Sequence, residues 1–107
     1  MKGEAGMLLQ IASFEEDAAA LQEGERHVRE EVVPSIQGAE GLLAAYWGID
    51  HKEGKRVSIM LWESPEAAGA AMPSVIDAIK RRRTDAGRDT PQASLTSTER
   101  FEVIAHL

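Results

Sequence analysis

The chain has 107 residues, of which 43% are hydrophobic and 28% are charged, and its formal net charge is −6. This length fits one compact domain, and the acidic balance lacks the positive field that attracts nucleic acid or an anionic membrane surface. The absence of cysteine excludes disulfides, thiolate nucleophiles and cysteine-ligated metal centres.

The predicted elements begin after a short lead-in. Residues 1–5 are expected to be disordered, so the single domain spans residues 6–107. The N-terminal segment lacks the small-residue cleavage site of a signal peptide, and no apolar run reaches the roughly 18 residues of a membrane span, so we expect a cytoplasmic protein. Residues 7–14 form a short apolar run without Pro or Gly, which predicts a buried strand.

Residues 15–33 predict an amphipathic helix. Leu21, Val28 and Val32 recur at helical spacing, with charged residues on the opposite side. Pro34 is expected to end or bend this helix near its C-terminal turn. His27 lies off the apolar stripe, so we expect it to be exposed to solvent.

A β-hairpin and a second helix follow. Residues 42–50 and 56–62 are rich in apolar and β-branched residues, and Gly54 in the short connection can adopt a positive φ, so they predict an antiparallel pair of strands. Ser64 and Pro65 then form a typical helix start, with a hydroxyl N-cap followed by proline at the first helical position. Pro73 falls inside this helix and predicts a kink or a break into two pieces.

The C-terminal part combines a polar stretch and a last strand. Residues 84–97 predict a long loop, either a mobile cover over a cavity on the helix side or a plain surface connector. Residues 98–107 alternate in polarity and predict the final strand.

The order of these elements, β-α-β-β-α-β, is typical of a ferredoxin-like α+β fold, with a four-stranded antiparallel sheet and two helices on one face. Both faces of the strands are apolar, since Leu42, Ala44 and Tyr46 alternate with residues that are also apolar. A sheet that is buried on both sides needs a second layer. With only two helices in the chain, we expect a second copy of the sheet to supply that layer in a homodimer.

Two segments, residues 38–42 (GAEGL) and 61–67 (LWESPEA), resemble the antibiotic-biosynthesis monooxygenase-like family. In that family a turn containing Pro or Gly enters the second strand, and the third strand ends in Trp, an acid and a small residue before an acid–Ala helix start. The resemblance extends over nearly the whole chain. It implies a dimeric α+β barrel, in which two sheets close around each other and a small pocket lies between each sheet and its helices.

Family members include cofactor-independent oxygenases that act on quinols or polyketide aromatics, and haem-degrading enzymes. The haem-degrading members resemble one another through an Asn on strand one, a Trp ending strand three and a His about ten residues later. Trp62 matches the second feature, but strand one has no Asn and Met72 stands where the His would be. The resemblance therefore disfavours haem degradation and implies an activity without a cofactor.

The candidate pocket residues come mainly from strand three. Ser58, Met60 and Trp62 share one face of that strand because side chains two apart do so. Together with Met72 they would form an apolar pocket with one hydroxyl, suited to a flat aromatic ligand, although core packing explains the same pattern. His106, near the end of the last predicted strand, is a further candidate for lining a cavity. The three histidines show no ligand spacing, so the sequence gives no support to a metal site.

Two functions remain open at this point. The first is a cofactor-independent monooxygenase with a small apolar pocket for an aromatic or quinol-type molecule, whose own electrons reduce oxygen once the pocket desolvates it. The second is a non-catalytic, small-molecule-binding or stress-associated dimer. A pure protein-interaction module is a third alternative.

Overall fold

The computed structural model describes residues 6–87 and 94–107, and the predicted lead-in, residues 1–5, lies outside them. The elements follow the predicted order. They are β1 (Leu8–Glu15), α1 (Ala18–His27), a π-helical segment η2 (Val28–Val32), α2 (Val33–Ile36), β2 (Leu42–Asp50), β3 (Lys55–Trp62), α3 (Pro65–Asp85) and β4 (Ser94–Glu102).

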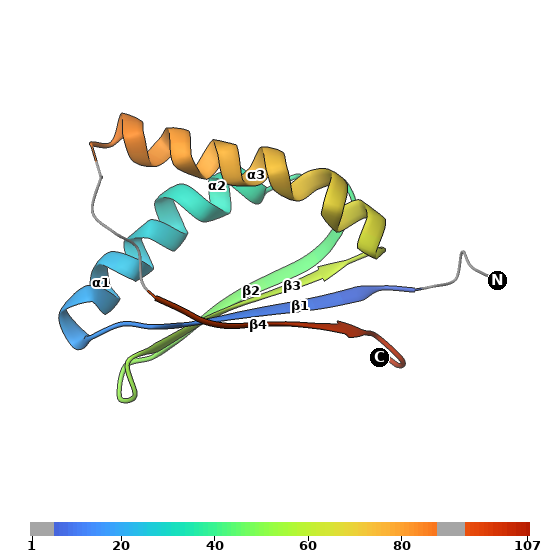
Figure 1. The fold of residues 1–107 in the computed structure, drawn as a ribbon, viewed down its shortest axis with the longest axis horizontal. Coiled ribbons are helices and arrows are strands. Elements are labelled where there is room, and N and C mark those ends of the chain that lie inside the picture. The colour runs from blue at the N-terminus through green and yellow to red at the C-terminus, as the bar shows by residue number, and fades with distance from the viewer. Residues whose placement is uncertain (1–5, 88–93) are drawn as a thin grey trace.

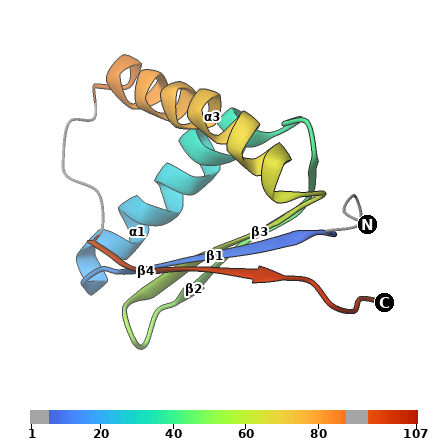
Figure 2. The same ribbon diagram turned by 45° about the vertical axis from the view of Figure 1, so that its right-hand side comes forward.

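The four strands form one antiparallel sheet in the order β2-β3-β1-β4. The helices all lie on the same face of this sheet, and the described residues leave the opposite face uncovered (Figures 1 and 2). This arrangement confirms the predicted ferredoxin-like α+β fold. None of the described helices, α3 included, combines the length and the apolar composition needed to cross a membrane.

The register of the strands decides which residues face the helices. Residues directly opposite each other in an antiparallel pair share a face, and Trp62 lies opposite Leu8 on β1 and Leu42 on β2. The pairing shifts between Leu42 and Ala44, and this bulge places Leu42 on the same side as Ala45. The predicted grouping of Leu42 with Ala44 and Tyr46 on one face was therefore wrong, because it assumed an unbroken alternation.

The core lies between the helices and the sheet. Trp62 is 0% exposed and Ile36 is 2% exposed. They belong to a cluster of buried side chains that joins β1, α2, β3 and α3, namely Leu8, Ile36, Trp62, Ala68 and Val75. Partly buried apolar residues, among them Met60, Met72 and Trp47, pack against this cluster.

The first helical region begins later than predicted and is irregular. The predicted start at Glu15 was wrong, because β1 continues through that residue and the Asp17 side chain caps α1 by accepting a hydrogen bond from the Ala20 N–H at 2.8 Å. The helix then passes through the π-helical turn, in which the Val33 N–H donates to the Val28 carbonyl. Pro34 follows directly, and the helix ends at Ile36, close to the predicted position.

α3 begins where the sequence predicts but is not broken. The Ser64 hydroxyl accepts a hydrogen bond from the Ala67 N–H at 3.0 Å, and the helix runs without interruption through Pro73 to Asp85. The predicted break into two pieces was wrong. Pro73 removes the partner of the Gly69 carbonyl, but both residues are exposed, so water can satisfy that oxygen.

The last strand spans residues 94–102, and the predicted range of 98–107 was wrong at both ends. Its side chains from Leu95 to Glu102 are exposed, so burial does not produce a hydrophobic pattern that marks its start. Pairing with the β1 backbone defines this edge strand instead. α3 and β4 thus take up both ends of the predicted long loop, and residues 88–93, the rest of the predicted cover or connector, lie outside the described residues.

Candidate functional site

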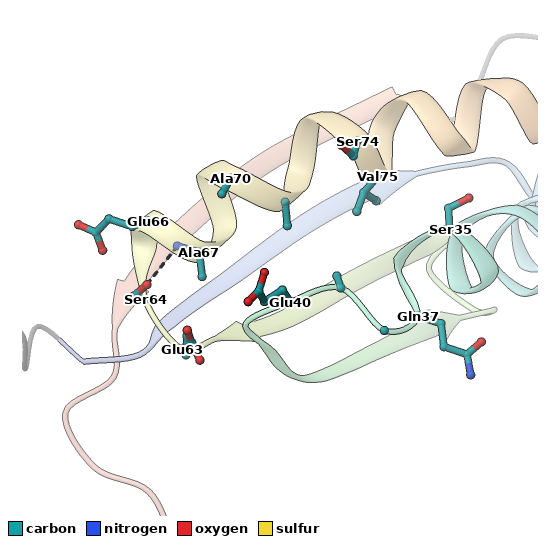
Figure 3. Close-up of a pocket in the computed structure, with 13 residues that line it drawn as sticks. Ser35, Gln37, Glu40, Glu63, Ser64, Glu66, Ala67, Ala70, Ser74 and Val75 are labelled. Atoms are coloured by element: carbon teal, nitrogen blue, oxygen red, sulfur yellow. Dashed lines mark hydrogen bonds between the residues drawn. The ribbon is translucent and has the colours of Figure 1, made fainter.

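A cavity of about 590 Å³ lies between the N-terminal half of α3 and the turn that connects α2 to β2 (Figure 3). We call it the α3 cavity. Its lining residues come from these two segments and from the end of β3: Ser35, Gln37, Gly38, Ala39, Glu40, Glu63, Ser64, Glu66, Ala67, Ala70, Ala71, Ser74 and Val75.

Two backbone features hold the turn against the start of α3. The Glu63 N–H donates to the Gly41 carbonyl at 2.8 Å. Gly41 has φ +86°, and a Cβ atom at this position would lie 2.5 Å from the Ala67 Cβ. Only glycine fits both the positive φ and this close approach. The GAEGL turn of the sequence therefore fixes the floor of the α3 cavity.

The wall of the α3 cavity is made of small apolar side chains backed by the core. Ala39, Ala67 and Ala71 line the cavity and also pack against the cluster that contains Trp62. All the charged residues that line the cavity are glutamates: Glu40 lies between the turn and α3, whereas Glu66 points away from the cavity (Figure 3). The arrangement can hold a small, largely apolar molecule with a hydrogen-bond donor directed at Glu40.

The predicted pocket residues of β3 face the helices, as expected, and Trp62 and Met60 belong to the core or pack against it. Trp62 is fully buried, and its indole N–H donates to the Gln10 side-chain oxygen at 2.9 Å. Met60 and Met72 pack against the same core cluster, so the structure brings these two together with Trp62. Ser58 is 8% exposed and lies opposite Trp47 on β2.

His106 does not join this group. β4 ends at Glu102, and His106 is an exposed residue four positions beyond that end. The sequence placed it on a strand because residues 98–107 alternate, but the alternation continues past the last residue that pairs with β1.

Sequence reasoning missed Gln10, the polar side chain that contacts Trp62. It lies on β1 opposite Met60 and faces the helices. A long amide side chain inside an otherwise apolar strand was the available signal, because a buried amide needs a hydrogen-bond partner.

It also missed a buried polar cluster between the first helical region and α3. His27 Nδ1 and Glu31 Oε1 form a hydrogen bond, and Arg83 Nη1 lies 3.5 Å from both atoms. His27 is 6% exposed and Glu31 is 1% exposed. The predicted exposure of His27 was wrong, because packing of α3 over this side of the helix covers it.

A second buried ion pair joins β3 to the residue that follows β1, near the hairpin. Arg56 Nη2 lies 3.5 Å from Glu16 Oε1, and both side chains are 4% exposed. The guanidinium also stacks over the Phe14 ring, with its carbon 4.5 Å from the ring centroid. Within residues 6–87 and 94–107, no cluster of three or more His, Cys, Asp or Glu side chains is arranged to hold a metal ion.

Solved structures with this fold include a putative antibiotic biosynthesis monooxygenase, a heme-degrader and a cofactor-independent oxygenase. A putative antibiotic biosynthesis monooxygenase from Chloroflexus aurantiacus is 20% identical, with a TM-score of 0.68, over 94% of this chain and 96% of that one. MhuD, a heme-degrader from Mycobacterium tuberculosis solved with two hemes in its active site, is 24% identical, with a TM-score of 0.70, over 94% and 98%. SnoaB, a cofactor-independent oxygenase from Streptomyces nogalater, is 12% identical, with a TM-score of 0.67, over 95% and 97%.

No protein-family model and no curated protein matches the chain. At these identities the structural neighbours show the fold alone. The resemblance to the antibiotic-biosynthesis monooxygenase-like family, predicted from the GAEGL and LWESPEA segments, is confirmed as a shared fold.

Proposed function

We propose that the chain is a cofactor-independent monooxygenase-type protein whose α3 cavity receives a small electron-rich aromatic molecule of the quinol or anthrone type. The observation that carries this proposal is the cavity of about 590 Å³ walled by alanines that back onto the Trp62 core. Its size suits a molecule of a few fused rings. SnoaB, which has the same fold, is a cofactor-independent oxygenase.

The proposed reaction requires few catalytic groups from the protein. An electron-rich substrate supplies its own electrons to oxygen once it has lost a proton, so the protein must exclude water from the ring and accept that proton. The alanine wall can exclude water from one side of the ring. Glu40, between the turn and α3, is the proposed proton acceptor.

Haem is not part of the proposal, although MhuD binds it. Trp62 is fully buried, and Met72 packs against the same cluster. These residues pack together between the helices and the sheet, so a porphyrin bound there would have to displace core side chains.

Oxygen consumption tests the proposal. The purified protein should consume oxygen with at least one member of a panel of quinols and anthrones. Ala70→Phe should abolish the consumption, because Ala70 lines the α3 cavity. Ala19→Phe is the matched control, since Ala19 is also an exposed helical alanine but lies on α1. Equal activity in the two variants would contradict the assignment of the α3 cavity.

Binding without chemistry is the second candidate, and one observation favours it. The carboxylates of the α3 cavity, Glu40, Glu63 and Glu66, are all exposed, whereas a catalytic base gains from desolvation. Thermal shift with the same panel separates the candidates: stabilisation of the wild type but not of Ala70→Phe, without oxygen consumption, would select binding alone.

We further propose that the functional unit is a homodimer joined through the uncovered face of the sheet. Ile59 is at the centre of this face, opposite Ile11 and Tyr46. Tyr46 is 67% exposed and Phe101 is 46% exposed, and both lie on this side. A contiguous apolar patch of this kind on a sheet is typical of a protein–protein contact.

Light scattering tests the dimer. The wild type should have twice the monomer mass at micromolar concentration, and Ile59→Lys should be monomeric because it buries a charge in the contact. Gln22→Lys, an exposed change on α1, should leave the mass unchanged. A monomeric wild type would refute the homodimer.

A further inference from the structure

A second cavity, of about 380 Å³, lies toward the other end of the sheet, between the first helical region and the β2–β3 hairpin. We call it the hairpin cavity. Val28, Val33 and Ile49 supply apolar walls, and Arg29, Trp47 and Arg56 supply nitrogen donors. It shares none of its lining residues with the α3 cavity.

Two N–H groups on the lining residues of the hairpin cavity have no hydrogen-bond partner. They are Trp47 Nε1 and Arg56 Nε, and both atoms are buried. Arg56 as a whole is 4% exposed, so water does not satisfy its donors from outside. Buried donors in folded proteins are nearly always paired, and an unpaired one calls for an explanation. Here two of them occur on one cavity.

The contacts of Arg56 explain why its Nε has no hydrogen-bond partner. Glu16 reaches only one guanidinium nitrogen, at 3.5 Å, which is longer than the roughly 2.7–2.9 Å of a strong charge-assisted hydrogen bond. The Glu16 carboxylate is pressed against α1, since a Cβ atom on Gly24 would lie 2.5 Å from its Oε2. Glu16 therefore pairs loosely with Arg56, and both Arg56 Nε and Glu16 Oε2 are buried without a hydrogen-bond partner.

The other arginine of the cavity is already matched. Arg29 contacts Glu25 through Nη2 at 3.0 Å and through Nε at 3.1 Å. Arg56 is thus the arginine of this cavity that still has a buried N–H without an acceptor. An acceptor that carries a negative charge suits it better than a neutral one.

The helix that lines this cavity is irregular at the same place. Val28 and Arg29 belong to the π-helical segment η2. Single π-helical turns are rare and recur at functional sites. This observation is independent of the unpaired donors and points to the same part of the molecule.

We propose that the hairpin cavity binds a small aromatic carboxylate of one or two rings. Its ring packs against Val28, Val33 and Ile49, and its carboxylate oxygens accept hydrogen bonds from Trp47 Nε1 and Arg56 Nε once these two side chains turn toward the cavity. The volume of the cavity is at the lower end of the range for small-molecule sites, which limits the ligand to this size. The site requires no oxygen chemistry and does not depend on the function proposed for the α3 cavity.

The two tryptophans of the chain make a direct test possible. The indole N–H region of a proton–nitrogen correlation spectrum should contain one resonance each for Trp47 and Trp62, and Trp62→Phe identifies the second by its loss. Titration with 2-naphthoate should shift the Trp47 resonance and leave that of Trp62 in place. Acetate at the same concentrations should leave both in place, because it lacks the ring.

Variants separate the donors from the shape of the cavity. Trp47→Phe keeps a ring but removes one donor, and it should weaken 2-naphthoate binding about tenfold or more. Val33→Phe should abolish binding by filling the cavity, with its thermal melt confirming that it is folded. Trp62→Phe should bind like the wild type. A Trp47 resonance that does not move at millimolar 2-naphthoate, or equal affinity of the wild type and Trp47→Phe, would overturn the proposal.

Discussion

The two tryptophans lie on the same face of the sheet but in different surroundings. Trp62 is fully buried, and its indole N–H is bonded to Gln10. Trp47 is partly buried, its indole N–H has no partner, and it lies beside Arg56, whose Nε is also unpaired.

This difference separates a region in which the buried indole N–H has a hydrogen-bond partner from a region in which buried N–H groups have none. Around Trp62, folding alone satisfies both the packing and the polar groups, so this end contributes mainly stability. Around Trp47, folding leaves buried donors unsatisfied, which costs free energy unless something else pairs with them. Proteins leave buried polar groups without hydrogen-bond partners mostly where function requires it.

The largest contrast is expected when each tryptophan is truncated. Trp62→Ala should lower the free energy of unfolding by about 3–5 kcal/mol, as for other buried aromatic side chains. Trp47→Ala should cost about half as much, because it removes less buried area. Urea denaturation of both variants measures the difference. Equal costs would mean that the Trp47 region is packed as completely as the Trp62 core.

Removal of the Arg56 side chain directly tests the region around Trp47. Arg56→Met should lower the free energy of unfolding by about 3 kcal/mol, because it leaves the carboxylate of Glu16 buried without a counter-charge. The double variant Glu16→Gln with Arg56→Met should recover most of this loss. If single and double variants are equally unstable, the cost comes from lost packing over Phe14 and not from the unpaired charge.

Local sequence signals predicted two features well, the start of α3 at the Trp62 end and the hairpin at the other end of the sheet. Ser64 and Pro65 marked the start of α3, and the apolar runs separated by Gly54 marked the hairpin, because capping and turn chemistry act over a few residues. The alternation of β3 also predicted that Ser58, Met60 and Trp62 face the helices. It could not show that Trp62 is fully buried in the core, since that depends on how closely α3 approaches.

The features that sequence reasoning missed all depend on contacts between distant segments. β4 begins at Ser94 in a polar stretch because it pairs with the β1 backbone, whatever its side chains are. Burial of Arg56 follows from its position between Glu16 and Phe14, which lie about forty residues earlier in the chain. His27 is buried only because α3 packs across it. None of these contacts leaves a periodic pattern in its own segment.

The smallest predicted effect, on replacing each tryptophan by phenylalanine, is the most direct test of the difference between Trp62 and Trp47. Trp62→Phe and Trp47→Phe make the same change, from an indole to a phenyl ring, so each loses similar volume and one N–H donor. Trp62→Phe also leaves the Gln10 oxygen without its partner, and it should cost about 2 kcal/mol in the free energy of unfolding. Trp47→Phe removes a donor that had no partner, so it should cost about 1 kcal/mol or less.

A double-mutant cycle assigns this difference to the hydrogen bond. Gln10→Leu combined with Trp62→Phe should cost less than the sum of the two single changes, with a coupling of about 1 kcal/mol. Gln10→Leu combined with Trp47→Phe should be additive, because Gln10 is bonded to the other tryptophan. If the coupling with Trp62 is absent, the hydrogen bond contributes nothing net, and the contrast between the two ends rests on packing alone.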